Sequence, residues 1–118
     1  MQNKSYCLGL DISSTVVGYC VSTSKEKVTN AGYIDISKET SIKEKAHKVA
    51  KELDKLNLEL SEIIVEDTLS GFGGGRTSQQ TIVKLSKCNA VISYVVEALY
   101  EMDVEHVNVS SLRTHKQP

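Results

Sequence analysis

The sequence has little proline and few aromatic residues, with one proline, one phenylalanine and no tryptophan, and it contains no long apolar run. A membrane-spanning helix needs roughly 20 consecutive apolar residues, and no stretch approaches that length. The N-terminus has no apolar segment after a basic start, so it does not resemble a secretory signal peptide. We therefore expect a cytoplasmic protein, or one of the nucleus or a viral factory if the host is eukaryotic.

Cysteine is also scarce. The three cysteines, Cys7, Cys20 and Cys88, are odd in number and show no Cys-x-x-Cys spacing. Neither a disulfide framework nor a zinc site is indicated. We interpret the three as reduced and mostly buried small apolar residues.

Neither sign of charge dominates, since the chain has 14 Lys and Arg and 15 Asp and Glu, for a formal net charge of -1. Such a chain has no strong field to attract a polyanion, so any nucleic-acid binding must depend on a local basic face. With 118 residues, 40% of them hydrophobic, the chain has the size and balance of one ordinary globular domain, which we place at residues 1–118.

Segments rich in apolar and β-branched residues predict three strands in the first third of the chain, at residues 5–10, 16–22 and 28–36. Residues 11–15 between the first two are turn material, which indicates a hairpin. We expect a kink or bulge at residues 30–32 in the third strand, because Asn, Ala and Gly interrupt its apolar pattern.

Two amphipathic helices follow. The first is predicted from apolar residues that recur every three or four positions, with a solvated face that carries His47 and four lysines; the apolar positions are Ile42, Ala46, Val49, Ala50, Leu53 and Leu56, and the lysines are Lys43, Lys45, Lys48 and Lys51. The second starts at Thr77 or Ser78 and ends at Tyr100 or Glu101. Its core stripe is Ile82, Leu85, Cys88 or Asn89, Ile92, Val96 and Leu99.

Two further strands complete the pattern. The apolar run 63–65 predicts a strand covered on both faces, and Val104, Val107 and Val109 predict the last strand, after which residues 110–113 look like the start of another helix. The order of elements predicts an α/β fold with a five-stranded mixed sheet flanked by helices. That is the order of a ribonuclease H-like fold, although several α/β folds share parts of it.

Asp11 and Glu66 each follow a predicted strand. In such a sheet these strands are parallel neighbours, so the two carboxylates can converge. Converging carboxylates repel each other unless they are protonated or bridged by a cation, and Mg²⁺ suits a site of few carboxylates with water and phosphate oxygens. The simpler alternative is that each acid ends a strand and faces water.

Residues 8–21, Leu-Gly-Leu-Asp-Ile-Ser-Ser-Thr-Val-Val-Gly-Tyr-Cys-Val, resemble the first motif of RuvC-type Holliday-junction resolvases and of the RuvC-like part of CRISPR nucleases. Residues 63–66 look like the glutamate-bearing strand of that family. The long helix from Thr77 and residues 107–110 are similar to its dimerisation helix and fifth strand, so the resemblance covers almost the whole chain.

The resemblance implies a ribonuclease H-like nuclease that resolves four-way DNA junctions by two-metal hydrolysis with Mg²⁺, or Mn²⁺ as a substitute. Asp11 would bridge both metal ions and Glu66 would hold one. It also implies a homodimer formed through the helix at residues 77–101, with two active sites on a two-fold symmetric junction.

The sequence departs from the family in two places. The family usually has glycine where Ser13 stands, a position that favours a left-handed backbone. Resolvases of this type also carry one or two further acids on a helix after the fifth strand, whereas no acid follows Glu105 here. We therefore expect a core that lacks the final catalytic helix, either truncated or degenerate, and that cleaves DNA poorly.

Several residues are candidates for DNA contact. Phe72, in the glycine-rich segment 69–76, can stack on an opened base, or it can fold back onto the core. A strip of cations can face phosphates, although solvated surface charge is the simpler explanation for each; the cations are Arg76, Lys84, Lys87, Arg113 and Lys116, with His115 beside the last two. Neither His47 nor His106 has a partner that makes it a good metal ligand.

Two other functions stay open. A resolvase relative that has lost cleavage would bind branched DNA through the same face, an alternative favoured by the absent third acid. Residues 11–15 also look similar to the phosphate-binding hairpin of actin-like and sugar-kinase ATPases. That family needs two such domains, which 118 residues do not supply.

Overall fold

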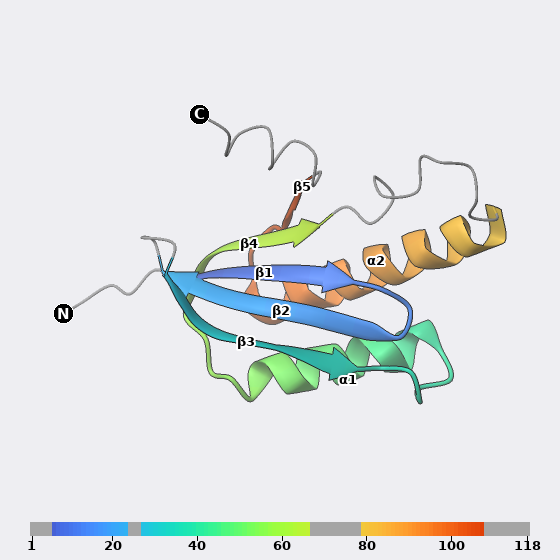
Figure 1. Ribbon diagram of the computed structural model, residues 1–118, viewed down its shortest axis with the longest axis horizontal. Coiled ribbons are helices and arrows are strands. Elements are labelled where there is room, and N and C mark those ends of the chain that lie inside the picture. Colours follow the sequence, from blue (N-terminus) through green and yellow to red (C-terminus); the bar gives the residue numbers. More distant parts are fainter. Residues whose placement is uncertain (1–5, 24–26, 67–78, 108–118) are drawn as a thin grey trace.

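The computed structural model describes residues 6–23, 27–66 and 79–107 (Figure 1). In chain order its elements are β1 (Tyr6–Ile12), β2 (Val16–Thr23), β3 (Val28–Asp35), α1 (Ile42–Asp54), β4 (Leu60–Glu66), α2 (Gln79–Tyr100) and β5 (Glu105–Val107). The strands form one sheet in the order β3-β2-β1-β4-β5. Neighbouring strands are antiparallel between β3, β2 and β1, and parallel between β1, β4 and β5, so the predicted five-stranded mixed sheet is confirmed.

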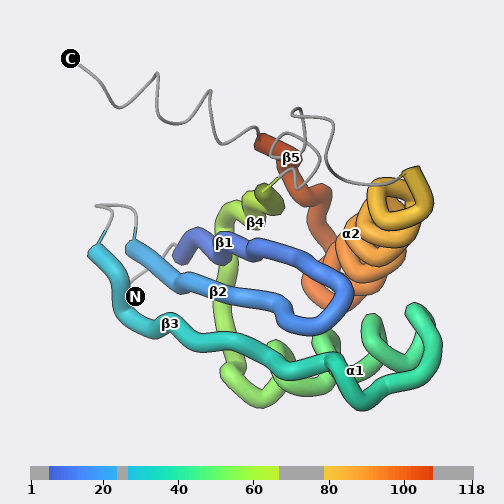
Figure 2. Tube along the Cα trace, turned by 45° about the vertical axis from the view of Figure 1, so that its right-hand side comes forward, coloured from blue at the N-terminus to red at the C-terminus, as the bar shows by residue number. Residues whose placement is uncertain are grey.

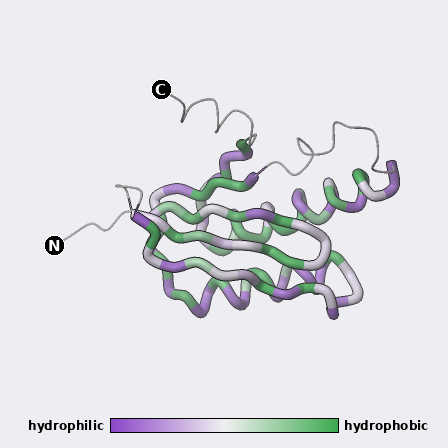
Figure 3. Tube along the Cα trace, in the orientation of Figure 1, coloured by the Kyte–Doolittle hydropathy of each residue, from purple (hydrophilic) through white to green (hydrophobic). Residues whose placement is uncertain are grey.

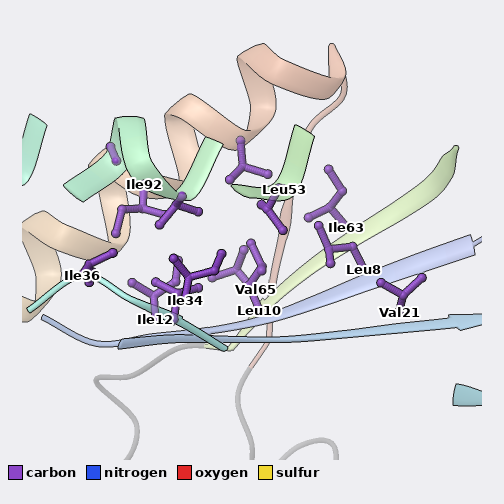
Figure 4. Packing of buried hydrophobic residues seen from close by; sticks show 14 residues of the cluster. Leu8, Leu10, Ile12, Val21, Ile34, Ile36, Leu53, Ile63, Val65 and Ile92 are labelled. Carbon is purple, nitrogen blue, oxygen red and sulfur yellow. The ribbon is translucent and has the colours of Figure 1, made fainter. Parts of the chain in front are cut away.

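Both helices pack on the same face of this sheet (Figure 2). Their apolar stripes meet alternate residues of β1, β2, β3 and β4, and the buried side chains fill the space between the layers (Figure 4). On β1, for example, Leu8, Leu10 and Ile12 are buried. Successive residues of a strand point to opposite faces of the sheet. The residues that alternate with the buried ones therefore point away from the helices.

No described helix covers the other face of the sheet, which we call the open face. Asp11 and Gly9 of β1 point to it, as do Gly18 of β2, Tyr33 of β3 and Ile64 of β4, because each alternates with buried neighbours. The expectation that residues 63–65 form a strand covered on both faces is therefore wrong for the described part of the molecule. Ile63 and Val65 are buried, but Ile64 is only half-buried on the open face.

Helix α1 forms where the amphipathic pattern predicts it, and in Figure 3 hydrophobic and hydrophilic positions alternate along it. Ser41 caps its N-terminus, since the Ser41 hydroxyl accepts a hydrogen bond from the backbone N–H of Glu44 at 3.1 Å. The helix ends at Asp54, and Asn57 then takes a positive φ of 56° as the chain turns towards β4.

One residue of α1 does not behave as predicted. Lys45 was expected on the solvated face with the other lysines, and this is wrong, because it is only 8% exposed. The reason is its position three residues after Ile42 and four before Val49, which places it on the buried stripe of the helix. Its neighbour His47 is exposed, as predicted.

The hairpin and the third strand also differ in detail from the predictions. Asp11 and Ile12 belong to β1 and pair with Gly18 and Val17, so the turn is shorter than residues 11–15. The irregularity in β3 lies at Thr29, where the register shifts between Val21 and Ser22 of β2. Residues 30–32 pair regularly, so the expected kink there is wrong.

Helix α2 ends at Tyr100, as predicted, and Glu101 follows with a φ of 55°. Its buried residues are Cys88, Asn89, Ile92, Ser93 and Val96. The expected helix start at Thr77 or Ser78, the end of the last strand and the helix start at 110–113 lie outside the described residues. Within the part that is described, no helix is both long and apolar enough to cross a membrane.

Candidate functional site

Asp11 and Glu66 lie at matching positions on neighbouring parallel strands. Leu10 of β1 pairs with Val65 of β4, and the two acids are the next residue on each strand. Leu10 and Val65 point into the core, so both acids point to the open face. Adjacent strands lie about 4.8 Å apart, so the two side chains start from neighbouring points on the sheet.

The two acids line one shallow concavity on the open face, with a volume of about 640 Å³. Most of its lining is small or apolar, and it is contributed by all five strands: Gly9, Leu10, Asp11, Gly18, Tyr19, Cys20, Ala31, Gly32, Tyr33, Ile64, Glu66 and Val107. Gly18 lies directly across from Asp11 on β2, so no side chain fills the space on that side of the carboxylate.

The turn after Asp11 is held by the side chain of Ser13. Its hydroxyl donates a hydrogen bond to the carbonyl oxygen of Val16 at 2.8 Å and accepts bonds from the backbone N–H groups of Val16 at 3.0 Å and Thr15 at 3.3 Å. Among described residues other than glycine, only Asn57 and Glu101 have a positive φ. Serine therefore fits at position 13 without the left-handed backbone that would favour glycine.

Two buried polar side chains from the helices reach the backbone beside the acids. The Lys45 ammonium of α1 donates to the carbonyl oxygens of Ser14 at 2.7 Å and Ile36 at 2.8 Å. The Asn89 amide of α2 donates to the carbonyl oxygen of Glu66 at 3.4 Å, and the Ser93 hydroxyl donates to Asn89 Oδ1 at 3.3 Å.

The donor set suits a hard cation. Asp11 and Glu66 offer carboxylate oxygens, the ligands that a hard divalent cation such as Mg²⁺ prefers. No group of three or more His, Cys, Asp or Glu side chains that could hold a metal occurs in residues 6–23, 27–66 and 79–107. Mg²⁺ is commonly held by one or two carboxylates together with water, so Asp11 and Glu66 are the residues that could hold it here.

The predicted DNA-contacting residues are only partly described. Lys84 and Lys87 are exposed near the N-terminal end of α2, where they line a second, smaller concavity with Ile42 and Gln80. This end of α2 lies at the side of the molecule towards which β1 and β4 point (Figure 1). The other four candidates, Phe72, Arg76, Arg113 and Lys116, lie outside the described residues.

Three residues of the site escaped prediction from sequence. Gly18 belongs to the first motif, but its place opposite Asp11 needs the strand register. Asn89 is on the predicted core stripe, where a polar residue is itself a signal, since a buried amide needs a partner. Lys45 follows the same logic, because its spacing from Ile42 and Val49 places a charge on an apolar stripe.

Two of three comparisons with known proteins found nothing. No family model matches the chain. No curated protein matches it either.

Solved structures do match. The Thermus thermophilus RuvC in complex with a Holliday junction substrate is similar with a TM-score of 0.69 and 9% identity, over 93% of this chain and 68% of that one. A second structure of Thermus thermophilus RuvC has a TM-score of 0.61 and 10% identity, over 87% of this chain and 63% of that one, so this chain spans less than two thirds of that relative. The polyphosphate/ATP-glucomannokinase of an Arthrobacter strain has a TM-score of 0.52 and 16% identity, over 88% of this chain and 44% of that one.

At identities of 9% to 16% these matches concern the fold and not the activity. They agree with the sheet order, the parallel and antiparallel pairs and the two helices on one face. The chain therefore has an α/β ribonuclease H-like fold, the fold that RuvC also has.

Proposed function

We propose that this chain is a metal-dependent endonuclease domain of RuvC type that acts on branched DNA, with Asp11 and Glu66 as the metal-binding carboxylates. One observation carries the proposal: the two acids follow the paired residues Leu10 and Val65 on adjacent parallel strands, face the open side of the sheet and share one concavity. The similarity of the fold to RuvC bound to a Holliday junction substrate supports the choice of DNA.

In this proposal Asp11 and Glu66 would hold the cation from the open face. Bound Mg²⁺, or Mn²⁺ in its place, would supply an activated water and offset the charge of the phosphodiester. Gly18 leaves room beside Asp11 for the substrate backbone, because it presents no side chain to the concavity. Within the described residues no helix lies over the open face, so an extended duplex or strand could approach the acids there.

Lys84 and Lys87 are proposed to contact phosphates beside the site. Both are exposed on the first half of α2, at the end of the molecule that β1 and β4 point to. Replacing either lysine with alanine should weaken binding to any DNA and reduce its salt dependence, since lysine–phosphate contacts position DNA without reading its sequence. The same role is proposed for Arg76, Arg113 and Lys116, with Phe72 as a stacking residue.

The outer side of α2 is proposed as the surface of a homodimer. Three large apolar residues are exposed there, Val83 at 49%, Val91 at 36% and Tyr94 at 69%. They lie on one side of the helix, opposite Ile92 and Val96 in the core. A second copy packed on Val91 and Tyr94, which lie C-terminal to Lys84 and Lys87 on α2, would leave the two lysines free for DNA. The two Asp11–Glu66 sites of such a dimer would be related by a two-fold axis, which suits a symmetric junction.

The experiment is a gel assay with a labelled four-way DNA junction and a linear duplex of the same sequence, with Mg²⁺ or Mn²⁺, scored for both binding and nicks. Variants Asp11→Asn and Glu66→Gln should remove nicks and leave binding intact. Glu62→Gln is the matched control, because Glu62 is an exposed acid on the same strand as Glu66, four residues away.

Nicks at the junction that need the metal and Asp11 are the expected result. Selective binding of the junction without nicks would favour a relative that binds branched DNA and does not cleave it. Equal binding and equal nicking of the junction and the linear duplex would overturn the choice of branched DNA as substrate.

The phosphate-binding hairpin of an ATPase is not proposed. Such a loop needs free backbone N–H groups for phosphate oxygens. In the β1–β2 turn the N–H groups of Thr15 and Val16 are bonded to the Ser13 hydroxyl, and the N–H of Ser13 is bonded to the Val16 carbonyl oxygen at 3.0 Å.

A further inference from the structure

Only three polar or charged residues are buried in the part of the chain that the structure describes, Lys45, Asn89 and Ser93. Buried polar groups weaken a core unless their hydrogen bonds are satisfied, so each needs a physical reason. All three act beside the proposed metal site. Lys45 bonds the turn that follows Asp11, and Asn89, supported by Ser93, bonds the carbonyl oxygen of Glu66 itself.

The contacts of Lys45 join three parts of the chain. Its ammonium comes from α1, and its two acceptors are Ser14 in the β1–β2 turn and Ile36 just after β3. A backbone bond from Ile36 N–H to the Thr15 carbonyl oxygen at 2.9 Å links the same two segments. The end of the hairpin is thus tied both to β3 and to the helix layer.

The choice of lysine is informative. A methionine or leucine would fill the same space on the apolar stripe of α1 without desolvating a charge. Instead the ammonium donates to two carbonyl oxygens with bonds of 2.7 and 2.8 Å, the short lengths expected when the donor is charged.

We propose that Lys45 and Asn89 are positioning residues that fix the separation of the Asp11 and Glu66 carboxylates, one by holding the turn after Asp11 and the other by holding the end of β4. The inference rests on the proposed function, because it assigns these residues to the same metal site. In this proposal neither side chain is itself a ligand of the metal. Lys45 acts through the carbonyl group of Ser14, three residues after Asp11, and Asn89 acts through the carbonyl group of Glu66 itself. The two side chains come from different helices.

The test uses the full 118-residue chain and Mn²⁺ alone as the probe, with free Mn²⁺ followed by electron paramagnetic resonance. Wild type is compared with Lys45→Met, Asn89→Leu and the conservative Lys45→Arg. Tyr100→Phe is the matched control, since the Tyr100 hydroxyl donates to the Leu53 carbonyl oxygen at 3.4 Å and also joins α2 to a backbone carbonyl, but at the far end of the helix.

We expect Lys45→Met and Asn89→Leu to weaken Mn²⁺ binding about tenfold, a typical loss when a residue that orients a metal ligand is removed. Lys45→Arg should retain most of the wild-type Mn²⁺ affinity. Tyr100→Phe should leave the Mn²⁺ affinity unchanged even if this variant has a lower melting temperature. Affinities within twofold of wild type in both Lys45→Met and Asn89→Leu would overturn the inference. If Lys45→Met does not fold, Asn89→Leu alone decides the outcome.

A second readout separates this inference from the proposed function. Amide hydrogen exchange of Thr15 and Val16 reports on the turn whether or not a metal binds. If wild type shows no Mn²⁺ binding that depends on Asp11, the proposed metal site fails. In that case, faster amide exchange of the turn in Lys45→Met, with the wild-type exchange rate in Tyr100→Phe, supports the role of Lys45 in holding the turn. An unchanged exchange rate in Lys45→Met refutes that role.

Discussion

The ring of Tyr19 lies over Gly32, its partner on β3, so closely that a Cβ built on Gly32 would be 2.7 Å from the tyrosine oxygen and 3.0 Å from ring carbon Cζ. Real Cβ atoms do not approach heavy atoms this closely. A larger residue at position 32 would therefore need the Tyr19 ring to shift, and it is this ring, not the backbone conformation of position 32, that favours glycine.

Replacing Gly32 with alanine should lower the free energy of unfolding by about 1 to 2 kcal/mol, because the Tyr19 ring must move from its packed position. Urea denaturation gives the value. Gly9→Ala is the control, since the nearest atom to its Cβ would be the Cys20 carbonyl oxygen at an ordinary 3.8 Å. The loss should vanish in a Tyr19→Leu background; an equal loss there would show that the ring is not the cause.

Gly18→Val tests the space beside Asp11. The Cβ at position 18 would lie 3.8 Å from the Asp11 Cβ, so the fold accepts it, and a β-branched residue suits a strand. The melting temperature should stay the same or rise, whereas nicking of a four-way junction should fall about tenfold or more as the branched side chain crowds the carboxylate. Ala31→Val, on β3 in the same concavity, is the control. Equal loss of nicking in both variants would contradict a specific role for Gly18.

The Cys7 thiol should react slowly with iodoacetamide. Burial, together with the negative charge of Glu62 and the hydrogen bond between the two side chains, raises the pKa of Cys7 from 9.0 to about 11. Only the thiolate reacts, so at pH 8 Cys7 should be alkylated about 100-fold more slowly than an ordinary thiol, as measured by peptide mass spectrometry.

Glu62→Gln should speed the alkylation of Cys7 more than Glu105→Gln does, since Glu105 has the smallest influence on that pKa. The same shift has a consequence for stability. The folded chain holds this proton more tightly than the unfolded chain, so the contribution of Cys7 is intact below pH 9 and is lost as the pH rises towards 11. Alkylation at the rate of a free thiol in the wild type would contradict both expectations.

Tyr94→Glu should convert a dimer into a monomer. The tyrosine is 69% exposed on the outer side of α2, and a charge there would be placed against its symmetry mate. Sedimentation velocity over a range of concentrations measures the change. Val28→Glu is the control, because Val28 is also an exposed apolar residue but lies on the edge strand β3 and not on α2. A wild-type chain that is monomeric at all concentrations would contradict the proposed interface.

The strands and helices were predictable because their signals are local. Period-two and period-3.6 patterns located all seven elements, and the long apolar stripe of α2 with Ile92 and Val96 was identified as core. The placement of Asp11 and Glu66 on neighbouring parallel strands followed from strand order alone. Its geometry depends on one register, Leu10 with Val65, which a sequence does not display directly.

What escaped prediction depends on contacts between distant segments. Helical spacing places Lys45 on the buried stripe of α1, but no helical pattern reveals the two carbonyl oxygens, 31 and 9 residues away, that accept hydrogen bonds from its ammonium. The irregularity at Thr29 reflects the pairing of β3 with β2, whereas the local signal pointed to Gly32. The open face was missed because Ile64 is as apolar as a core residue, although it has no described layer above it.

The one-sided packing of the sheet also separates two sets of residues that a laboratory could vary independently. Along β1 the even-numbered positions serve the core, along β2 the odd-numbered ones do, and the positions between them line the open face. A library restricted to open-face positions such as Gly9, Cys20 and Ala31 would leave the buried layer untouched. Such a library would sample new surfaces around Asp11 and Glu66 on a scaffold whose interior is unchanged, so gains and losses of activity could be assigned to the surface itself.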